Sequence, residues 1–205
     1  MTRLFSYCIP IDDGAAPNPF WGTCTLAICK PAIRRIAKAG DWIVGTGSVN
    51  SPIGDISGRV VYAMKVTEVM SLAQYDTHAR RHLPGKIPSW FNKDPRRRLG
   101  DAIYDFSSNP PRIRRSVHGE KNRTRDLRGR NVLLSSHFYY FGDHPVPLPA
   151  ALLPIIKQGS GHRSSANAPY IAPFLKWIAS LGLEPNRLHG TPQYRLFRDQ
   201  GELNV

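Results

Sequence analysis

Short apolar runs, each bounded by glycine, proline or aspartate, divide the chain into predicted strands. The clearest run extends from Gly58 to Val69, where β-branched and apolar residues follow one another with few interruptions. The first run begins at Leu4 and stops at Pro10, which precedes a turn-prone segment. By these criteria we predict strands over residues 4–9, 42–48, 58–69 and 131–136.

Two segments have the apolar spacing that is typical of an amphipathic helix. Over residues 25–39 apolar side chains recur at roughly helical intervals, and a glycine–aspartate pair at Gly40 ends the segment. Pro31 either begins a second helix within this segment or kinks a single one. A shorter helix is predicted over residues 172–181.

The order of these elements favours an α+β fold. A helix, a glycine–aspartate turn, a strand with a glycine-rich loop and a long strand suit a small mixed β-barrel with flanking helices. The 205 residues can bury one sizeable core but would be cramped as two full domains. Residues 77–130 mix prolines, arginines and short apolar pieces without a sustained period. We therefore predict a single domain, residues 1–205, with a long basic insertion at about 77–130.

Positive charge is concentrated in that insertion. The formal net charge is +13, and residues 80–130 hold 15 Lys and Arg against 5 Asp and Glu. A confined positive patch is typical of proteins that bind a phosphate backbone, because binding releases condensed counterions. The alternative is a solvated loop whose charge only keeps the protein in solution. We expect DNA as the partner, or else RNA or a modified nucleotide.

Composition argues against several other classes of protein. Hydrophobic residues make up 41% of the chain, enough for a packed interior, but no apolar run is long enough to cross a membrane. Three cysteines are too few for a disulfide scaffold. His78 and His82 have the spacing of helical metal ligands, but the arginines between them favour a solvated helix face. We expect a cytoplasmic protein with no membrane contact, no metal and no cofactor.

Aromatic residues and glycines mark a candidate site for a nucleobase. Phe20 and Trp21 could stack on an extruded base, Asn18 could pair with a base edge, and the glycines of 45–48 would admit a ligand to the backbone. Each has a structural alternative, as a barrel cap or an ordinary turn. Residues 138–141 are all aromatic, so on a strand two should face the core and two a groove. The predicted base-binding residues are Asn18, Phe20, Trp21, Thr25, Gly45, Thr46, Gly47, Ser48 and Tyr139.

Basic residues are the candidates for phosphate contact. They lie on the predicted helix over residues 25–39, in the insertion, and in a glycine–serine loop near residue 160. Ordinary solvated loops and helix faces are the alternative reading of these positions. The predicted phosphate-binding residues are Lys30, Arg34, Arg96, Arg97, Arg98, Arg114, Arg115 and Arg163.

Several segments resemble the second nucleotide-modification-associated domain family. The resemblance rests on residues 16–34, which contain the motif Pro-Asn-Pro-Phe-Trp-Gly, and on residues 40–45, 62–66, 100–104 and 138–142. It extends over most of the chain and is most specific in the first 76 residues. The resemblance implies a place in bacterial or phage systems that handle modified DNA bases.

A more distant similarity, in the order and spacing of elements, is to the EVE, YTH and ASCH domains. Those domains are PUA-like barrels that hold a base between aromatic side chains. The similarity implies a PUA-like barrel for this chain. The leading hypothesis is a binding module that takes a modified or flipped base into an aromatic pocket while the insertion holds the backbone.

Two alternatives stay open beside this hypothesis. Some ASCH-type domains hydrolyse acylated nucleosides with a Thr, a Lys and a Glu. In an enzyme of that kind Thr25 would be the nucleophile, Lys30 its activator and Glu68 the proton carrier, although their spacing does not match closely. The other alternative is an interaction subunit whose aromatic residues are all core and whose insertion docks a partner protein or RNA. We expect the binding module rather than the enzyme.

Overall fold

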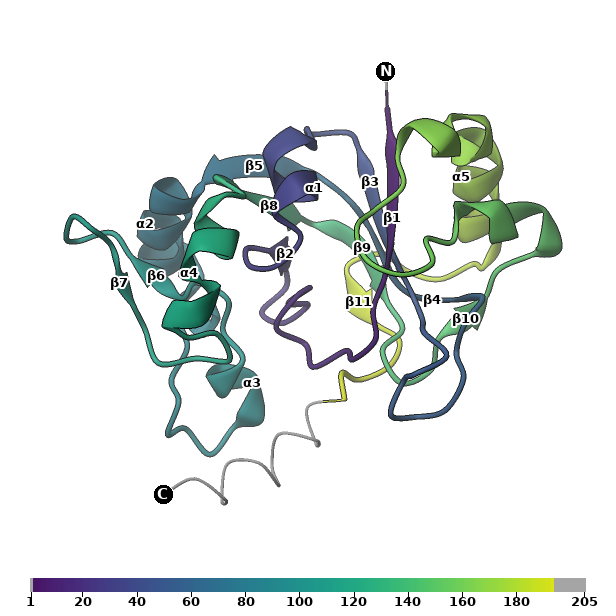
Figure 1. Ribbon diagram of the computed structural model, residues 1–205. Helices are drawn as coiled ribbons and strands as arrows, with labels where there is room; N and C mark the ends of the chain where they lie inside the picture. The colour runs from purple at the N-terminus through teal and green to yellow at the C-terminus, as the bar shows by residue number, and fades with distance from the viewer. Residues whose placement is uncertain (1, 194–205) are drawn as a thin grey trace. The chain divides into compact units, whose positions relative to one another are not determined.

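Segments that are distant in the sequence come together in two structural units. The computed structural model describes residues 2–193, and Figure 1 shows their helices and strands. Within these residues, unit 1 comprises 2–12, 37–67 and 135–192, and unit 2 comprises 13–36, 68–134 and 193. The predicted basic insertion lies in unit 2, together with the proline-rich segment that carries Phe20 and Trp21.

Unit 1 is built on one mixed sheet. Its strands are β1 (Leu4–Cys8), β3 (Trp42–Thr46), β4 (Arg59–Lys65), β9 (His137–Tyr140), β10 (Val146–Pro147) and β11 (Arg187–Leu188). Its helices are the 3-10 helices η2 (Ala150–Ile155) and η3 (Ser165–Tyr170) and the α-helix α5 (Ile171–Ser180). The strand order is β1–β3–β4–β9–β11, with β10 paired to β4. β1 runs parallel to β3 and β11 parallel to β9, and the other pairs are antiparallel.

Both faces of this sheet are buried. On one face, Trp42, Val44 and Ala63 form a core with Phe174 of α5, which lies beside the sheet in Figure 1. On the other face, the hydroxyl oxygens of Tyr7 and Tyr62 lie 2.9 Å apart. A strand that is covered on both sides needs apolar residues at consecutive positions. This explains the nearly continuous apolar run that predicted β4.

The aromatic run 138–141 is entirely buried, so the expected groove-facing pair is wrong. Tyr139 and Phe141 lie in the core beneath α5. Phe138 and Tyr140 point to the opposite face, where the Tyr140 hydroxyl donates to Oδ1 of Asp12 at 2.5 Å. Alternation along the strand is as expected, but protein covers both faces.

Unit 2 combines a three-stranded sheet with short helices. Its strands are β2 (Cys24–Leu26), β5 (Glu68–Ser71), β6 (Tyr104–Asp105), β7 (Arg112–Ile113) and β8 (Asn131–Ser135, the last residue of which belongs to unit 1). Its helices are α1 (Pro31–Ile36), α2 (Leu72–His82), the 3-10 helix η1 (Pro84–Lys86), α3 (Pro95–Arg98) and α4 (Glu120–Leu127). The sheet has the order β2–β8–β5, and β6 pairs with β7. Buried Leu72, Tyr75 and Ala79 of α2 pack against Val132 and Leu134 of β8.

The predicted helix over residues 25–39 is wrong in its first half. That half contains β2, and the helix α1 begins only at Pro31, which suits a first helical position because it has no N–H to place there. The preceding residues Cys29 and Lys30 have φ angles of 56° and 37°. A right-handed helix cannot pass through residues in the left-handed region. Of the two alternatives for Pro31, the start of a separate helix is therefore confirmed.

The mixed composition of helices and sheets is confirmed. Within residues 2–193 the strands form open sheets and no closed barrel, so the PUA-like barrel stays a prediction. Over the same residues, no helix has the length and apolar character that crossing a membrane requires.

Candidate functional site

The predicted ligand-binding segment 45–48 lies in unit 1, at the end of β3 and just beyond it, and all four residues are buried. A Cβ atom on Gly45 would lie 2.5 Å from the ring of Tyr62. A Cβ atom on Gly47 would lie 2.3 Å from the carbonyl oxygen of Ile56. The glycines are therefore required because the protein packs closely against itself, and the space beside them is filled.

Tyr139 and Arg163 are the other candidates in unit 1. The Tyr139 ring stacks on that of His189, with centroids 6.3 Å apart. Arg163 is half-buried, and its backbone exchanges two hydrogen bonds with that of Ser6, at 2.9 and 3.0 Å. The Nε atom of Arg163 is buried and has no hydrogen-bond partner among the described residues. All the remaining candidates lie in unit 2.

The proline-rich segment of unit 2 folds back on β2. Backbone atoms of Asn18 and Thr25 exchange two hydrogen bonds, at 2.8 and 2.9 Å. Asn18 is fully buried and donates from its side chain to the carbonyl of Leu99. Phe20 is buried in an apolar cluster, whereas Trp21 is 37% exposed. Of the three predicted base-binding residues in this segment, Trp21 is thus the one that presents its ring to solvent.

A buried polar cluster surrounds Thr25. The Lys86 ammonium group donates to Oγ1 of Thr25 at 2.9 Å and to Oδ1 of Asn18 at 2.7 Å. It also donates to two backbone carbonyls, each within 2.8 Å. The Thr25 hydroxyl donates to Oδ2 of Asp101 at 2.6 Å, and the Tyr75 hydroxyl donates to Oδ1 of the same carboxylate at 2.6 Å. The cluster therefore ties the proline-rich segment to η1 and α2.

Burial sets the electrostatics of this cluster. Desolvation lowers the pKa of Lys86 to about 8, although the charge of Asp101 opposes the shift. Desolvation raises the pKa of Asp101, against the stabilising effects of Lys86, Thr25 and Tyr75. The adjoining cavity, beside Asp101 and Tyr75, measures about 10 Å³, which leaves room for about one water molecule at most. Full burial and the lack of space favour a structural role for the cluster.

The residues inferred for an ASCH-like reaction all lie in unit 2 but occupy different settings. The hydroxyl of Thr25 is engaged by Lys86 and Asp101. Lys30 precedes α1, and Glu68 is exposed at the start of β5. Sequence reasoning missed Lys86 because a lysine within a basic insertion carries no signal that it is buried.

A group of exposed and half-buried aromatic and arginine side chains forms the candidate nucleic-acid interface. We define this aromatic–arginine surface as Trp21, Trp90, Phe91, Arg96, Arg97 and Arg115. The guanidinium carbons of Arg96 and Arg97 lie 5.4 and 5.8 Å from the ring centroid of Trp21. That of Arg115 lies 5.6 Å from the Trp90 ring and 4.9 Å from the Phe91 ring. Phe91 is 82% exposed, so its ring is held by a cation and covered by little else.

Local hydrogen bonds and close packing fix the segments that carry this surface. The Asp94 side chain caps α3 by accepting from the backbone of Arg96 at 2.9 Å. The loop before α3 is closed by a bond from the Ser89 amide to the Arg97 carbonyl, at 2.7 Å. Trp21 packs on Gly85, where a Cβ atom would lie 2.5 Å from the indole. Each aromatic ring is thus presented on an ordered segment.

Three other predicted phosphate contacts are occupied inside unit 2. Arg34 is fully buried and donates to the carbonyls of Cys29 and Asn131 at 2.7 and 2.9 Å, so it cannot reach a phosphate. Burial lowers the pKa of Arg34 to about 10. Arg114 is mostly buried and pairs with Asp76 at 2.7 Å. Arg98 is half-buried and donates to a loop carbonyl at 2.6 Å. Carboxylates and carbonyls of the protein therefore occupy the side chains that the sequence assigned to phosphate.

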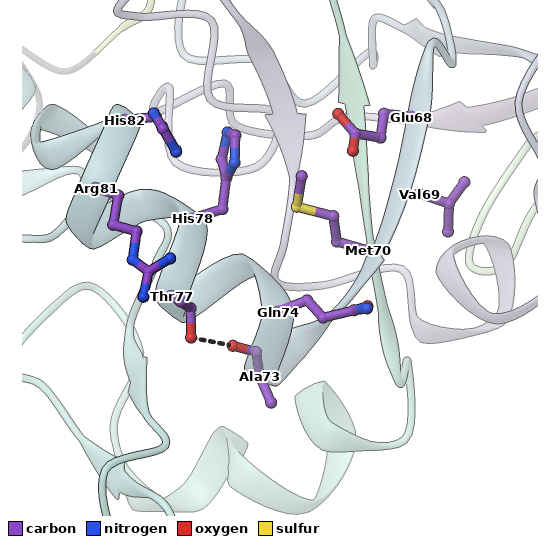
Figure 2. Close-up of a pocket in the computed structure, with 9 residues that line it drawn as sticks. All are labelled: Glu68, Val69, Met70, Ala73, Gln74, Thr77, His78, Arg81 and His82. Carbon is purple, nitrogen blue, oxygen red and sulfur yellow. Dashed lines mark hydrogen bonds between the residues drawn. The ribbon is translucent and has the colours of Figure 1, made fainter.

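A separate hollow of about 550 Å³ lies along β5 and α2. Figure 2 shows Glu68 and Met70 entering it from β5, and His78, Arg81 and His82 from α2. The centroids of the two histidine rings are 4.9 Å apart. Within residues 2–193, no group of three or more His, Cys, Asp or Glu side chains is arranged to hold a metal ion. The volume is within the range of small-ligand sites, but the lining includes none of the predicted base-binding residues.

Comparison with known proteins identifies the family of this chain. Residues 1–199 match the model of nucleotide modification associated domain 2. No curated protein and no solved structure matches. The match covers nearly the whole chain, including the proline-rich segment and the aromatic–arginine surface. The chain therefore belongs to the nucleotide modification associated domain 2 family.

Proposed function

We propose that this protein binds nucleic acid through the aromatic–arginine surface, in a role linked to DNA base modification, and that bases stack on Trp21 and Phe91. The observation that carries the proposal is the set of arginine–ring contacts around exposed aromatic side chains. Membership of a family associated with nucleotide modification supports the link to DNA modification.

Exposed rings and arginines supply complementary parts of single-strand recognition. An aromatic ring stacks on any base, with about 1–3 kcal/mol per base. A guanidinium group beside the ring can contact the neighbouring phosphate or stack on the base itself. Phe91 is 82% exposed, and an isolated phenylalanine in water contributes nothing to stability. A base that stacks on Phe91 and Arg115 would explain why the ring lies exposed beside the guanidinium group.

The charge distribution supports the same surface. Arg34 and Arg114 are committed to buried partners, and Arg80 pairs with Asp105 at 2.7 Å. Arg115 is exposed. Arg96 is exposed but forms an ion pair with Asp94 at 2.8 Å, and half-buried Arg97 donates to the carbonyl of Pro84 at 2.7 Å. The positive charge that is available to a phosphate backbone is therefore smaller than the sequence total, and part of it lies beside aromatic rings.

The finer part of the proposal is that Trp21 selects the base. The indole is partly exposed, rests on η1 and is flanked by two guanidinium groups. Asn18 and Phe20 are buried behind it, so they support the segment and do not meet the base. A modified base would stack on Trp21 while the arginines hold the backbone.

The proposal is tested by fluorescence anisotropy with short single-stranded DNA, duplex DNA and RNA of one sequence, with and without a modified base. Trp21→Ala and Phe91→Ala should each weaken single-strand binding by about 1–3 kcal/mol. Trp21→Ala should also reduce the preference for the modified base. The matched control is Leu153→Ala, which removes a 44% exposed apolar side chain in unit 1. Unchanged affinity in both aromatic variants, with their folds intact, would refute the interface.

A further inference from the structure

A thiol, an imidazole and a carboxylate contact one another in a row within unit 2. The Sγ atom of Cys29 is 3.5 Å from Nε2 of His118, and Nδ1 of His118 is 2.5 Å from Oδ2 of Asp126. Both ring nitrogens are thus engaged, one by the thiol and the other by the carboxylate. Cys29 and His118 are partly exposed, whereas Asp126 is fully buried. This gradient of exposure suits a nucleophile and a base that meet a substrate, with a buried group that orients the base.

The backbone at Cys29 is fixed in an unusual conformation. Its φ angle is 56°, in the left-handed region that residues with a Cβ atom seldom adopt. The Cys29 amide donates to Oδ1 of Asp126 at 3.0 Å, and its carbonyl accepts from Nε of buried Arg34 at 2.7 Å. The Tyr104 hydroxyl donates to the second oxygen of Asp126 at 3.2 Å. Asp126 therefore holds both the residue that carries the thiol and the ring that faces it.

The protonation of His118 reflects these contacts. Burial alone would lower the pKa of His118, but the hydrogen bonds with Asp126 and Cys29 outweigh it and raise the pKa to about 9. The negative charge of Asp13 also interacts with the ring. At neutral pH the ring is therefore an imidazolium. A positive charge beside a sulfur atom favours the thiolate, which is the nucleophilic form of a cysteine.

We propose that Cys29, His118 and Asp126 form a catalytic triad for acyl transfer, which acts on carboxylic esters, thioesters or amides. Sγ attacks the carbonyl carbon and forms a C–S bond, the bond to the leaving group breaks, and Nε2 of His118 gives its proton to that group. Water then attacks the thioester and passes a proton to His118. The C–S bond breaks, the carboxylic acid leaves, and the thiolate and imidazolium are restored. Asp126 is a positioning residue that orients the ring, and water is the one co-reactant.

The first test uses the unmodified protein and compares its three thiols. Cys8 is the internal reference because it is also partly exposed, while Cys24 is fully buried. After brief exposure to p-nitrophenyl acetate, peptide mass spectrometry should find acetyl on Cys29 formed at least about tenfold faster than on Cys8. Release of p-nitrophenol should show a stoichiometric burst followed by slower turnover. Equal acetylation of Cys29 and Cys8 would overturn the proposal.

Variants separate catalysis from a structural role. Cys29→Ala should abolish the burst, whereas Cys8→Ser should leave it unchanged. His118→Gln keeps a donor toward Asp126 but removes the proton relay, and should slow acylation about 100-fold or more. Asp126→Asn should displace the pH dependence of acylation, which a loss of stability alone would not do. A burst that survives in folded Cys29→Ala, or an unchanged rate in folded His118→Gln, would show that the three residues are structural only and overturn the proposal.

Discussion

At the scale of single residues, Lys86 shows how unit 2 accommodates a buried charge. Its ammonium group is surrounded by four oxygen acceptors, which include Oγ1 of Thr25 and Oδ1 of Asn18. The neighbouring Asp101 carboxylate accepts two hydroxyl groups. A buried charge keeps its partners because leaving it unsatisfied costs more than the net value of any one bond. The Thr25 hydroxyl is central because it bonds to both charged groups.

Thr25→Val should therefore destabilise the fold by about 1–3 kcal/mol, because it removes one acceptor from Lys86 and one donor from Asp101. Urea denaturation measures the loss. Thr77→Val is the matched control, since the exposed Thr77 hydroxyl donates only within α2, to the carbonyl of Ala73, and should change stability by less than about 0.5 kcal/mol. The amidohydrolase alternative predicts a different result, namely loss of turnover on acylated nucleosides with stability intact.

Titration of His118 should make stability depend on pH. Its pKa is about 9 in the folded protein and near 6.5 in an unfolded chain. Below pH 6.5 both states are protonated and the stabilisation is fully present. As pH rises from 6.5 to 9 the folded state alone keeps the proton, so the free energy of unfolding should fall.

Chemical denaturation of Cys29→Ala at pH 6, 7 and 8 measures this slope, because without the thiol no proton lost from Cys29 offsets the one that His118 keeps. Adding His118→Gln should flatten it. Above pH 8 the lowered pKa of Lys86 has the opposite effect, because there the unfolded chain binds the additional proton. The informative comparison is thus the difference between Cys29→Ala and the double variant below pH 8. Identical slopes in the two proteins would contradict the raised pKa of His118.

The types of residue in the sequence predicted one part of the candidate site but not the others. Adjacent aromatics in a proline-rich segment identified Trp21, whose ring is indeed partly exposed. Cys29 and His118 were not connected, because 89 residues separate them in the sequence and neither belongs to a recognisable motif. The burial of Arg34 and Lys86 was equally hidden, since a basic side chain is usually solvated.

At the scale of elements, η1 and α3 position the aromatic–arginine surface. Both are too short to be stable alone. The cap at Asp94 and the Ser89–Arg97 bond stabilise the loop, and Lys86 anchors the end of η1. The indole of Trp21 lies on Gly85 of η1 because no side chain stands there.

Gly85→Ala should displace the Trp21 ring, because the new methyl group would lie 2.5 Å from indole atoms. We expect weaker single-strand binding, a change in tryptophan fluorescence and a stability loss of about 1–3 kcal/mol. Gly119→Ala is the control, since its Cβ atom would have no neighbour within 4 Å. Anisotropy and fluorescence measure the two effects. Full binding by a folded Gly85→Ala protein would argue against stacking on Trp21.

The elements that were predicted correctly are those with a strong local signal. β1, β3, β8 and α5 each coincide with a sustained apolar run or helical period. The strand predicted over residues 58–69 is correct for β4 only, because the chain leaves that strand after Lys65 and residues 68–69 belong to β5 in another sheet. α2 was missed in a segment rich in charge, although Ser71 and Gln74 form a capping box at its start. The first half of the predicted helix over 25–39 was wrong because apolar spacing there cannot distinguish β2 and a turn from helix.

At the scale of the whole molecule, the arginines of unit 2 occupy two different settings. Arg34 and Arg114 stabilise the interior, whereas Arg96 and Arg115 lie at exposed rings. A net charge of +13 gives any nucleic acid some attraction to the protein. Overall charge alone therefore cannot identify the interface, and a test must compare equal charge changes at different places.

The salt dependence of single-stranded DNA binding tests the proposed interface most directly. Two triple variants lower the net charge equally. One replaces Arg96, Arg97 and Arg115 by Gln, and the other replaces the exposed Lys121, Arg125 and Arg128 by Gln. For the first variant, the slope of log affinity against log salt should become shallower by about two units, since each lost phosphate contact contributes about 0.7. The second should keep a slope close to that of the unmodified protein. Equal slopes in all three proteins, or a larger change in the second variant, would contradict nucleic-acid binding at the aromatic–arginine surface.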